Sequence, residues 1–257
     1  MANYNTYLLD KNGKVTTDLT EGDLYVSVST ILKMEGKDLV TWALRTFGGE
    51  EEPMKAYQAY MDKVSGLGSR LHAYVEHDLK GEHDVADAMV REDMLAAVTQ
   101  WHTFRDNNDI RLVASERIVY SPKYRVAGTC DLVCELNGDL FVGDFKTGKI
   151  YPSAFCQMAA YWSFMCEEPK KSRIKGIEKA GLLGIHLPRD GGPVKAYTLE
   201  EYYDNKMTMK DELGIFHALR FLWAKRNLKS RKWEAVIKNM ADVMSPLEEK
   251  FKQAFDL

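Results

Sequence analysis

Two aspartates and a lysine flank a short turn in the middle of the chain, and together they could hold a cation. Asn137-Gly138 separates two strand-like runs. This pair predicts a type I′ hairpin, because both central residues of that turn need a positive φ angle. The register of such a hairpin places Asp131 directly opposite Asp144. Lys146 points to the same face as Asp144, because side chains alternate along a strand.

Two carboxylates that face each other on a sheet repel, so a fold that keeps the pair is expected to place a cation between them. Carboxylate oxygens are hard ligands, and they favour Mg²⁺ or Mn²⁺. The alternative is that Asp131 and Asp144 are ordinary solvated residues beside a hairpin, since a D-x-K spacing alone is common. The surrounding residues favour the metal site.

Three motifs occur in order around this hairpin. They are G-T-C-D-L-V at 128–133, V-G-D-F-K-T-G at 142–148, and Gln157-x-x-x-Tyr161 downstream. This arrangement resembles the PD-(D/E)XK nuclease superfamily, in particular its RecB-like and phage exonuclease branch. In that family a G-x-x-D strand, a D-x-K strand and a Q-x-x-x-Y helix follow one another. The resemblance implies a restriction-endonuclease-like fold and metal-dependent cleavage of DNA.

The resemblance also implies a set of metal ligands. Residues 66–76 are similar to the family's G-x-x-x-H-x-x-x-E helix, in which His72 and Glu76 share one helical face. The implied ligands of one or two Mg²⁺ or Mn²⁺ ions are His72, Asp131, Asp144 and the backbone carbonyl of Phe145. Glu76 is expected to orient His72 from outside the ligand set. An ordinary position on the helix face is the alternative for both helical residues.

The implied catalytic residues are Asp131, Asp144, Lys146, Gln157 and Tyr161. Lys146 would orient the attacking water or stabilise charge on the phosphate. Gln157 and Tyr161 lie one helical turn apart and would complete the pocket, and the alternative is a buried tyrosine whose hydroxyl bonds the glutamine. Glu116 occupies a strand position where many relatives carry a glutamate close to the active site.

Two sets of residues are candidates for contact with nucleic acid. The S-V-S-T-I-L run at 27–32 resembles the S-V-T-x-I-L motif of phage exonucleases and of the mitochondrial genome-maintenance exonuclease. A hydroxyl-rich helix N-terminus can hold a phosphate, which makes Ser27 and Ser29 candidates, and simple helix capping is the alternative. Six of the thirteen residues from Arg220 to Lys232 are basic. The candidate contacts in that stretch are Arg226, Lys229 and Arg231.

The charge distribution limits how DNA could be bound. A formal net charge of −3 argues against a protein that coats nucleic acid by bulk positive charge, but it allows a local groove. Basic residues also cluster between Lys170 and Lys179, and a solvated face is the alternative for each cluster. Trp223 and Trp233 could stack on bases, although aromatic residues at helical spacing are more often part of a core.

The remaining pattern predicts a single α/β nuclease domain, 1–257, with a restriction-endonuclease-like α-β-β-β-α-β core. Its mixed sheet would be flanked by helices. The expected strands cover 24–30, 110–120, 124–136, 139–146, 179–187 and 194–198. A first helix is expected to begin near residue 29 or 30. Further helices are expected at 38–47, 52–64, 69–80, 85–107, 153–167, 199–227 and 232–255. The domain would comprise a helical lead-in (1–65), a catalytic core (66–190) and a helical C-terminal extension (191–257).

Cysteine content and the start of the chain bear on cofactors and location. The four cysteines form no C-x-x-C pair and all lie between 130 and 166. We therefore expect reduced, mostly buried thiols and no iron–sulfur cluster. The first residues lack a basic region followed by an apolar run, and no stretch of about 18 apolar residues occurs. The expectation is a cytoplasmic protein, in the host cytoplasm if the source is viral, with no membrane partner.

The expected function is a DNA exonuclease that processes strand ends, single or double, in phage-type recombination or repair. A recombinase or a single-strand-binding protein is a candidate partner, and the oligomeric state is left open. A structure-specific endonuclease and a catalytically inactive nucleic-acid-binding module are the alternatives. G-D-F-K-T-G-K at 143–149 also matches a phosphate-binding loop, but Ile150 replaces the required hydroxyl, so an NTPase is not expected.

Overall fold

The computed structural model describes residues 6–18, 22–35, 53–230, 233–234 and 236–237. Three predictions fall wholly or mostly outside these ranges: the helix at 38–47, the terminal helix at 232–255 and the candidate DNA contact Arg231.

Seven described strands form one mixed sheet with the order β1-β2-β4-β5-β6-β7, and β3 pairs with β4. Their bounds are β1 Thr6–Leu9, β2 Asp23–Ser27, β3 Ile110–Ser121, β4 Val126–Leu136, β5 Asp139–Lys146, β6 Gly181–His186 and β7 Lys195–Thr198. β3, β4 and β5 are consecutive and antiparallel, whereas β5 and β6 are parallel. The predicted α/β class with a mixed sheet flanked by helices is therefore confirmed.

The N-terminal part was wrongly predicted as a helical lead-in. The described part of 1–65 contains an antiparallel pair of strands, β1 and β2. The strand predicted at 24–30 ends at Ser27, because helix α1 (Val28–Leu32) starts there. The start of α1 lies one or two residues before the predicted position, and its N-cap is Ser27.

The β4–β5 hairpin has the predicted register. Leu136 pairs with Asp139 across the turn, and the ladder continues to Leu132 and Gly143. Asn137 and Gly138 both have positive φ angles, 54° and 94°, as a type I′ turn requires. This local turn fixes which side chains of the two strands come together.

One edge of β4 is shared by two strands. β3 pairs along the whole of β4, so β2 and β5 divide its other edge. β2 takes Val126 and Ala127, and β5 takes the residues from Leu132 to the turn. Residues 128–131 therefore lie at a fork in the sheet, and Asp131 is the last residue before β5 joins.

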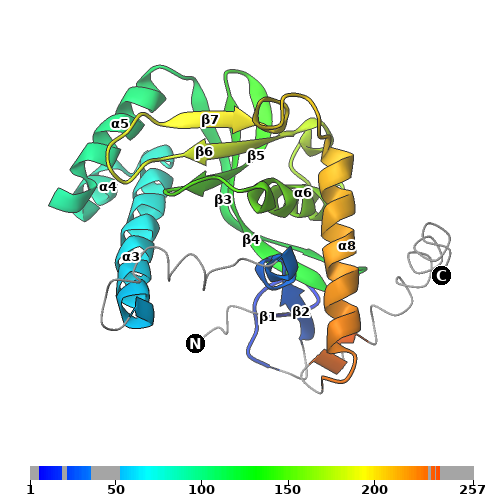
Figure 1. Cartoon of the computed structure of the whole chain (residues 1–257). Coiled ribbons are helices and arrows are strands. Elements are labelled where there is room, and N and C mark those ends of the chain that lie inside the picture. The colour runs from blue at the N-terminus through cyan, green and yellow to red at the C-terminus, as the bar shows by residue number, and fades with distance from the viewer. Residues whose placement is uncertain (1–5, 19–21, 36–52, 231–232, 235, 238–257) are drawn as a thin grey trace.

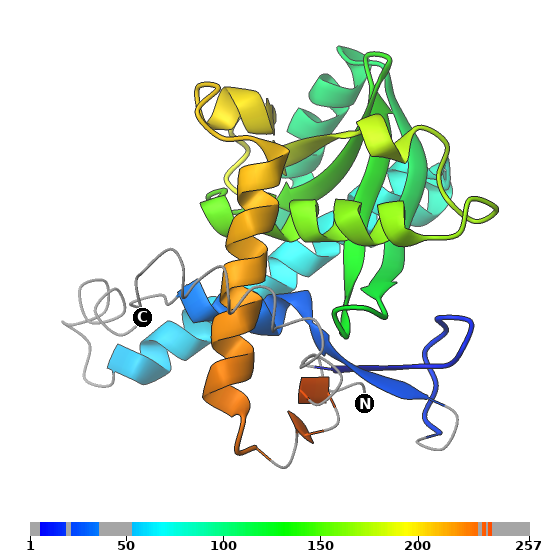
Figure 2. The same cartoon turned by 90° about the vertical axis from the view of Figure 1, so that its right-hand side faces the viewer.

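Helices cover both sides of the sheet (Figure 1). α6 (Pro152–Glu167) and α8 (Met209–Asn227) pack with one core cluster, which contains Val133, Val142 and Phe164. α3 (Pro53–Leu79), α4 (His83–Met89) and α5 (Leu95–Asp106) pack with a second cluster around Leu71, Trp101 and Phe145. Figure 2 shows α6 and α8 crossing on their side. No helix within the described ranges is long and apolar enough to cross a membrane.

The two helices predicted at 52–64 and 69–80 form one helix, α3. The predicted gap between them, residues 65–68, contains Gly66 and Gly68, and both glycines are helical in α3. Gly68 instead allows a close tertiary contact, since a Cβ at this position would lie 2.9 Å from Oγ1 of Thr147. The glycine therefore brings α3 against the end of β5.

Two long helices were predicted where the chain has breaks. The segment 85–107 contains α4, a 3₁₀ turn at Glu92–Met94 and α5, and extended backbone at Val90 separates them. The segment 199–227 contains α7 (Leu199–Tyr202) and α8, and Asp204 and Asn205 between them have positive φ angles. Capping boxes at Thr198 and Thr208 start the two helices, so local hydrogen bonds override the continuous helical pattern.

Candidate active site

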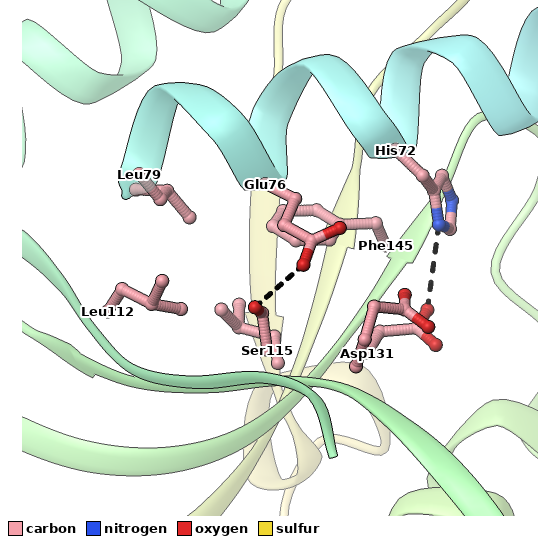
Figure 3. A pocket seen from close by; sticks show the side chains of 9 residues that line it. His72, Glu76, Leu79, Leu112, Ser115, Asp131 and Phe145 are labelled. Atoms are coloured by element: carbon pink, nitrogen blue, oxygen red, sulfur yellow. Dashed lines mark hydrogen bonds and ion pairs between the residues drawn. The ribbon is translucent and has the colours of Figure 1, made fainter. Parts of the chain in front are cut away.

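The candidate site lies where α3 crosses the fork in the sheet. His72 and Glu76 project from one face of α3 toward β3 and β4 (Figure 3). The pocket between these elements is lined by His72, Glu76, Leu79, Leu112, Ser115, Glu116, Asp131, Leu132 and Phe145. The predicted ligands His72, Asp131 and Phe145 are thus brought together, although they come from three separate elements.

Asp131, Asp144 and Lys146 form the predicted cluster. The carboxyl groups of Asp131 and Asp144 lie close enough for the charge on Asp144 to act on Asp131. Nζ of Lys146 lies 2.5 Å from Oδ2 of Asp144. That oxygen is buried and makes no hydrogen bond of good geometry, so the contact with Lys146 is a close ion pair with poor hydrogen-bond angles. The alternative that these are solvated surface residues is wrong, because Asp144 is only 2% exposed.

Burial dominates the electrostatics of this cluster. Burial and the neighbouring carboxylate of Asp144 raise the pKa of Asp131 above its usual range. Burial opposes the charge on Lys146, but the carboxylates of Asp144 and Asp131 outweigh it and raise the pKa of that lysine. Asp131, Asp144 and Lys146 therefore share a site in which a second negative charge is unfavourable. A bound cation would offset that cost, so the electrostatics suit a cation site.

His72 connects α3 to both predicted carboxylate strands. Its Nδ1 lies 3.7 Å from Oδ2 of Asp131, and its ring packs edge to face with the ring of Phe145, with centroids 5.9 Å apart. Burial lowers the pKa of His72, which favours the neutral imidazole that binds metals. Among the residues that the structure describes, no three His, Cys, Asp or Glu side chains stand close enough to form a ready-made metal cage. The backbone carbonyl of Phe145, which is also a predicted ligand, is not a side chain and does not count toward such a set.

Glu76 and Glu116 lie on the other side of the pocket. Glu76 accepts hydrogen bonds from Ser115 Oγ (2.8 Å) and Lys80 Nζ (2.6 Å), and it does not bond His72. Glu116 has a φ angle of 45°, a left-handed conformation that is rare for glutamate. Burial and the charge on Glu76 raise the pKa of Glu116. The left-handed backbone at Glu116 directs its partly buried carboxyl group into the pocket that Asp131 also lines.

Gln157 and Tyr161 hydrogen-bond each other on α6. Nε2 of Gln157 donates to the hydroxyl of Tyr161 over 2.8 Å. Tyr161 is buried against Gly128, where a Cβ would lie 2.4 Å from the tyrosine ring. Burial raises the pKa of Tyr161 well above its ordinary value, and the charge on Asp131 adds to this effect. The pair therefore packs under the fork of β4, close to Asp131 but outside the lined pocket.

The serine and arginine candidates for DNA contact have different surroundings. The hydroxyl of Ser27 is buried, accepts the Thr30 N–H (3.1 Å), and bonds Ser29 Oγ (3.1 Å). Ser27 was therefore wrongly predicted as a phosphate contact, since capping occupies it, whereas Ser29 is exposed. Arg226 and Lys229 are also exposed, but no interaction joins them to the pocket residues.

Trp223 and Trp233 are part of the core, which was the more common role expected for aromatic residues at helical spacing, and base stacking is not supported. Their rings pack edge to face with centroids 4.9 Å apart, and both side chains are buried in the core beside α8. Arg220 is buried as well. The basic stretch after residue 220 therefore has a smaller exposed basic surface than its composition suggests.

Sequence reasoning missed Ser115, which links Glu76 to β3. A serine in a strand carries no motif, and regular alternation along β3 places neighbouring residues such as Ser115 and Glu116 on opposite faces, so no sequence signal indicated that both line the pocket. The predicted cysteine burial is confirmed for three of four thiols, since Cys130, Cys134 and Cys156 are buried and Cys166 is partly exposed.

Comparisons with known proteins identify no relative. No protein-family model and no curated protein matches this sequence. The roles of the site residues are therefore inferred from their geometry and chemistry.

Proposed function

We propose that this chain is a metal-dependent nuclease of the PD-(D/E)XK type that hydrolyses phosphodiester bonds in DNA. One observation carries the proposal: Asp131, Asp144 and Lys146 converge at the fork of the sheet, with the charge of one carboxyl group acting on the other and the ammonium group 2.5 Å from Oδ2 of Asp144. A buried pair of acids is unfavourable by itself. It is favourable when a divalent cation and a phosphate are present.

The donor set fits Mg²⁺ or Mn²⁺. Asp131, Asp144, the Phe145 carbonyl and His72 would hold the ion, because three of these ligands present oxygen and the fourth a neutral imidazole. Oδ2 of Asp144 is buried without a well-aligned hydrogen bond, so it has an unused lone pair for a metal. When bound, the ion would lower the pKa of a water molecule and neutralise charge on the phosphate.

The protein's own groups would divide the remaining work. Lys146 is held by Asp144 on the same strand, so its ammonium group can stabilise negative charge on the phosphate or orient the attacking water. Glu116 and Glu76 would be the ligands of a second ion in the same pocket. The Gln157–Tyr161 pair fixes the backbone at Gly128, which positions Asp131 three residues later.

The order of elements supports a restriction-endonuclease-like core. A helix precedes three antiparallel strands, and a helix and a parallel strand follow, as α5, β3, β4, β5, α6 and β6. The acids and the lysine occupy the second and third of those strands. The proposed fold family rests on this agreement in the order of the helices and strands and in the strands that carry the acids and the lysine.

We propose an exonuclease because the motif resemblance is to enzymes that process strand ends. The test uses end-labelled linear DNA and circular DNA, single- and double-stranded, with Mg²⁺ or Mn²⁺. Release of nucleotides from linear substrates with circular DNA intact is expected. Rapid cutting of circular single strands would indicate an endonuclease, and binding of DNA without cleavage of any substrate would indicate an inactive binding module.

A further inference from the structure

Arg220 is an unusual arginine because it is fully buried without a counter-ion among the residues that the structure describes. Its side chain is 0% exposed, and Nε, Nη1 and Nη2 find no hydrogen-bond acceptor among the described residues. Burial lowers the pKa of Arg220, but a guanidinium remains charged at neutral pH. An unpaired charge in a protein interior costs several kcal/mol. A compensating anion is therefore expected.

Three basic side chains meet at the ring of Tyr124, in the turn between β3 and β4. The ring centroid lies 4.7 Å from Cζ of Arg220, 4.9 Å from Nζ of Lys123 and 4.7 Å from the imidazole centroid of His217. Nδ1 of His217 is also buried without a hydrogen-bond partner within the described ranges. Lys123 is exposed, so the cluster extends from the surface to the interior.

Contact with the ring does not by itself compensate for burying Arg220. A desolvated cation–π contact contributes about 2 kcal/mol, less than the cost of the unpaired charge. The ring also covers only a face of the guanidinium, whereas the N–H donors lie in its plane. Glu167 lies close to this turn, but it accepts a hydrogen bond from Ser121 (2.6 Å). Its electrostatic partner is Lys123 rather than Arg220.

We propose that Arg220, His217 and Lys123 form a binding site for a tetrahedral oxyanion such as phosphate or sulfate. The guanidinium fork binds two oxygens of such an anion side by side. Neutral His217 can donate to a third oxygen from Nδ1 in one of its tautomers, and Lys123 attracts the anion from the surface. Donors that approach from a helix and from a turn suit a tetrahedral anion better than a planar carboxylate.

This site is separate from the carboxylate pocket. Tyr124 packs with the core cluster of α6 and α8, whereas Phe145 and Leu71 belong to the cluster of α3 and α5. The anion site therefore does not depend on the proposed nuclease activity.

The test is calorimetric titration of inorganic phosphate into the full chain, without divalent metal or nucleic acid. Saturable one-site binding is expected, together with a rise in melting temperature. Arg220→Met should weaken phosphate binding by about tenfold or more, because a charged hydrogen-bond donor is lost. Lys210→Met is the control, since it removes one positive charge from an exposed position on the same helix and Lys210 belongs to neither proposed phosphate-binding region. Unchanged phosphate affinity in Arg220→Met would overturn the proposal.

A second variant covers the case in which Arg220→Met does not fold. Lys123→Met changes an exposed residue and should weaken phosphate binding by roughly threefold, with a smaller effect at high salt. Absence of saturable binding to the wild-type chain also overturns the proposal. Competition with an oligonucleotide that carries or lacks a 5′-phosphate then identifies the source of the anion. Displacement by the phosphorylated strand alone indicates a strand end, and no displacement indicates a free anion.

Discussion

At the scale of single residues, the proposed site depends on the charges of three side chains. An isosteric replacement of any of the three removes its charge. Asp131 and Asp144 supply anionic oxygens, and Lys146 supplies the only cation in contact with them among the described residues. His72 adds a neutral nitrogen on the opposite wall of the pocket. These residues make separate and testable contributions.

Loss of any member of the cluster should abolish cleavage. Asp131→Asn, Asp144→Asn and Lys146→Ala are each expected to lower the cleavage rate by about a hundredfold or more, because each removes a charge that acts on the phosphate or its cation. The measurement is single-turnover cleavage of linear DNA with Mn²⁺. Asp139→Asn is the control, since this exposed carboxylate lies on the same hairpin. Wild-type cleavage by Asp144→Asn would exclude the proposed nuclease.

The metal-free protein should lose stability as the pH rises. The pKa of Asp131 is raised in the folded state by burial and by Asp144, so folding favours its protonated form. The resulting stabilisation is complete below the unfolded pKa, about 4, and disappears as the pH rises through the folded pKa. Asp131→Asn should therefore raise the free energy of unfolding at about pH 8 by roughly 1 kcal/mol or more. It should have little effect at about pH 4, where the wild-type acid is already neutral.

Thermal denaturation in a chelating buffer at both pH values measures this difference. The same substitution at Asp139 is expected to change neither curve. Asp144→Asn is expected to be less favourable than Asp131→Asn, because it leaves Lys146 without its closest carboxylate. A lower melting temperature for Asp131→Asn at both pH values would indicate that this acid has a structural partner.

His72 is expected to shift metal preference toward Mn²⁺. An imidazole nitrogen among oxygen ligands favours later transition ions over Mg²⁺. His72→Ala should lower metal affinity by roughly tenfold or more and reduce the ratio of Mn²⁺- to Mg²⁺-supported activity. Metal titrations of cleavage, with His77→Ala as a control from the same helix, test this. Identical titration curves for the His72 variant and the wild type would show that the residue is not a ligand.

At the scale of elements, glycines determine how closely helices approach the sheet. Gly128 lets Tyr161 of α6 lie against β4, and Gly68 lets α3 lie against Thr147. Both contacts join segments far apart in the chain. The first fixes the strand that carries Asp131, and the second fixes the helix that carries His72.

Gly128→Ala should destabilise the fold. Its Cβ would lie 2.4 Å from Cε1 of Tyr161, so the ring or the strand must move, and overpacking of this kind costs about 1–3 kcal/mol. Gly214→Ala is the control, because a Cβ in that position of α8 meets nothing within 4 Å. It should stabilise the chain by about 0.5–1 kcal/mol. Urea denaturation measures both, and equal stability of the two variants would contradict the packing argument.

At the scale of the whole molecule, DNA binding should depend on local rather than net charge. The chain has a net charge of −3, so phosphate contacts must come from exposed basic patches such as Arg226 and Lys229. Changing Arg226, Lys229 and Arg231 to Ala should weaken binding equally for all base compositions. It should also reduce the dependence of log affinity on log salt by roughly 0.7 for each lost single-strand contact.

Fluorescence anisotropy across a salt series measures that slope. Lys14→Ala with Lys206→Ala is a control, because both residues are exposed and lie outside this stretch. An unchanged slope in the triple variant would show that the stretch after Arg220 is an ordinary solvated surface. The DNA track would then be sought in the basic residues between Lys170 and Lys179.

The sequence by itself determined the hairpin, its register and the cluster on it. Asn137-Gly138 permits one tight turn, and a turn of known length fixes the pairing of the strands that it joins. Strands β3 to β6 and helix α6 were also predictable, because their periodicity is strong and their ends carry turn residues. These features depend on interactions within a few residues of each other.

Only the tertiary structure decided what depends on distant contacts. It showed that α3 is continuous through Gly66 and Gly68, that Glu116 is turned into the pocket by a strained backbone, and that Arg220 is buried rather than presented to solvent. A glycine or an arginine has the same local pattern in either setting. Its role is set by the neighbours that folding brings to it, and these neighbours lie far away in the chain.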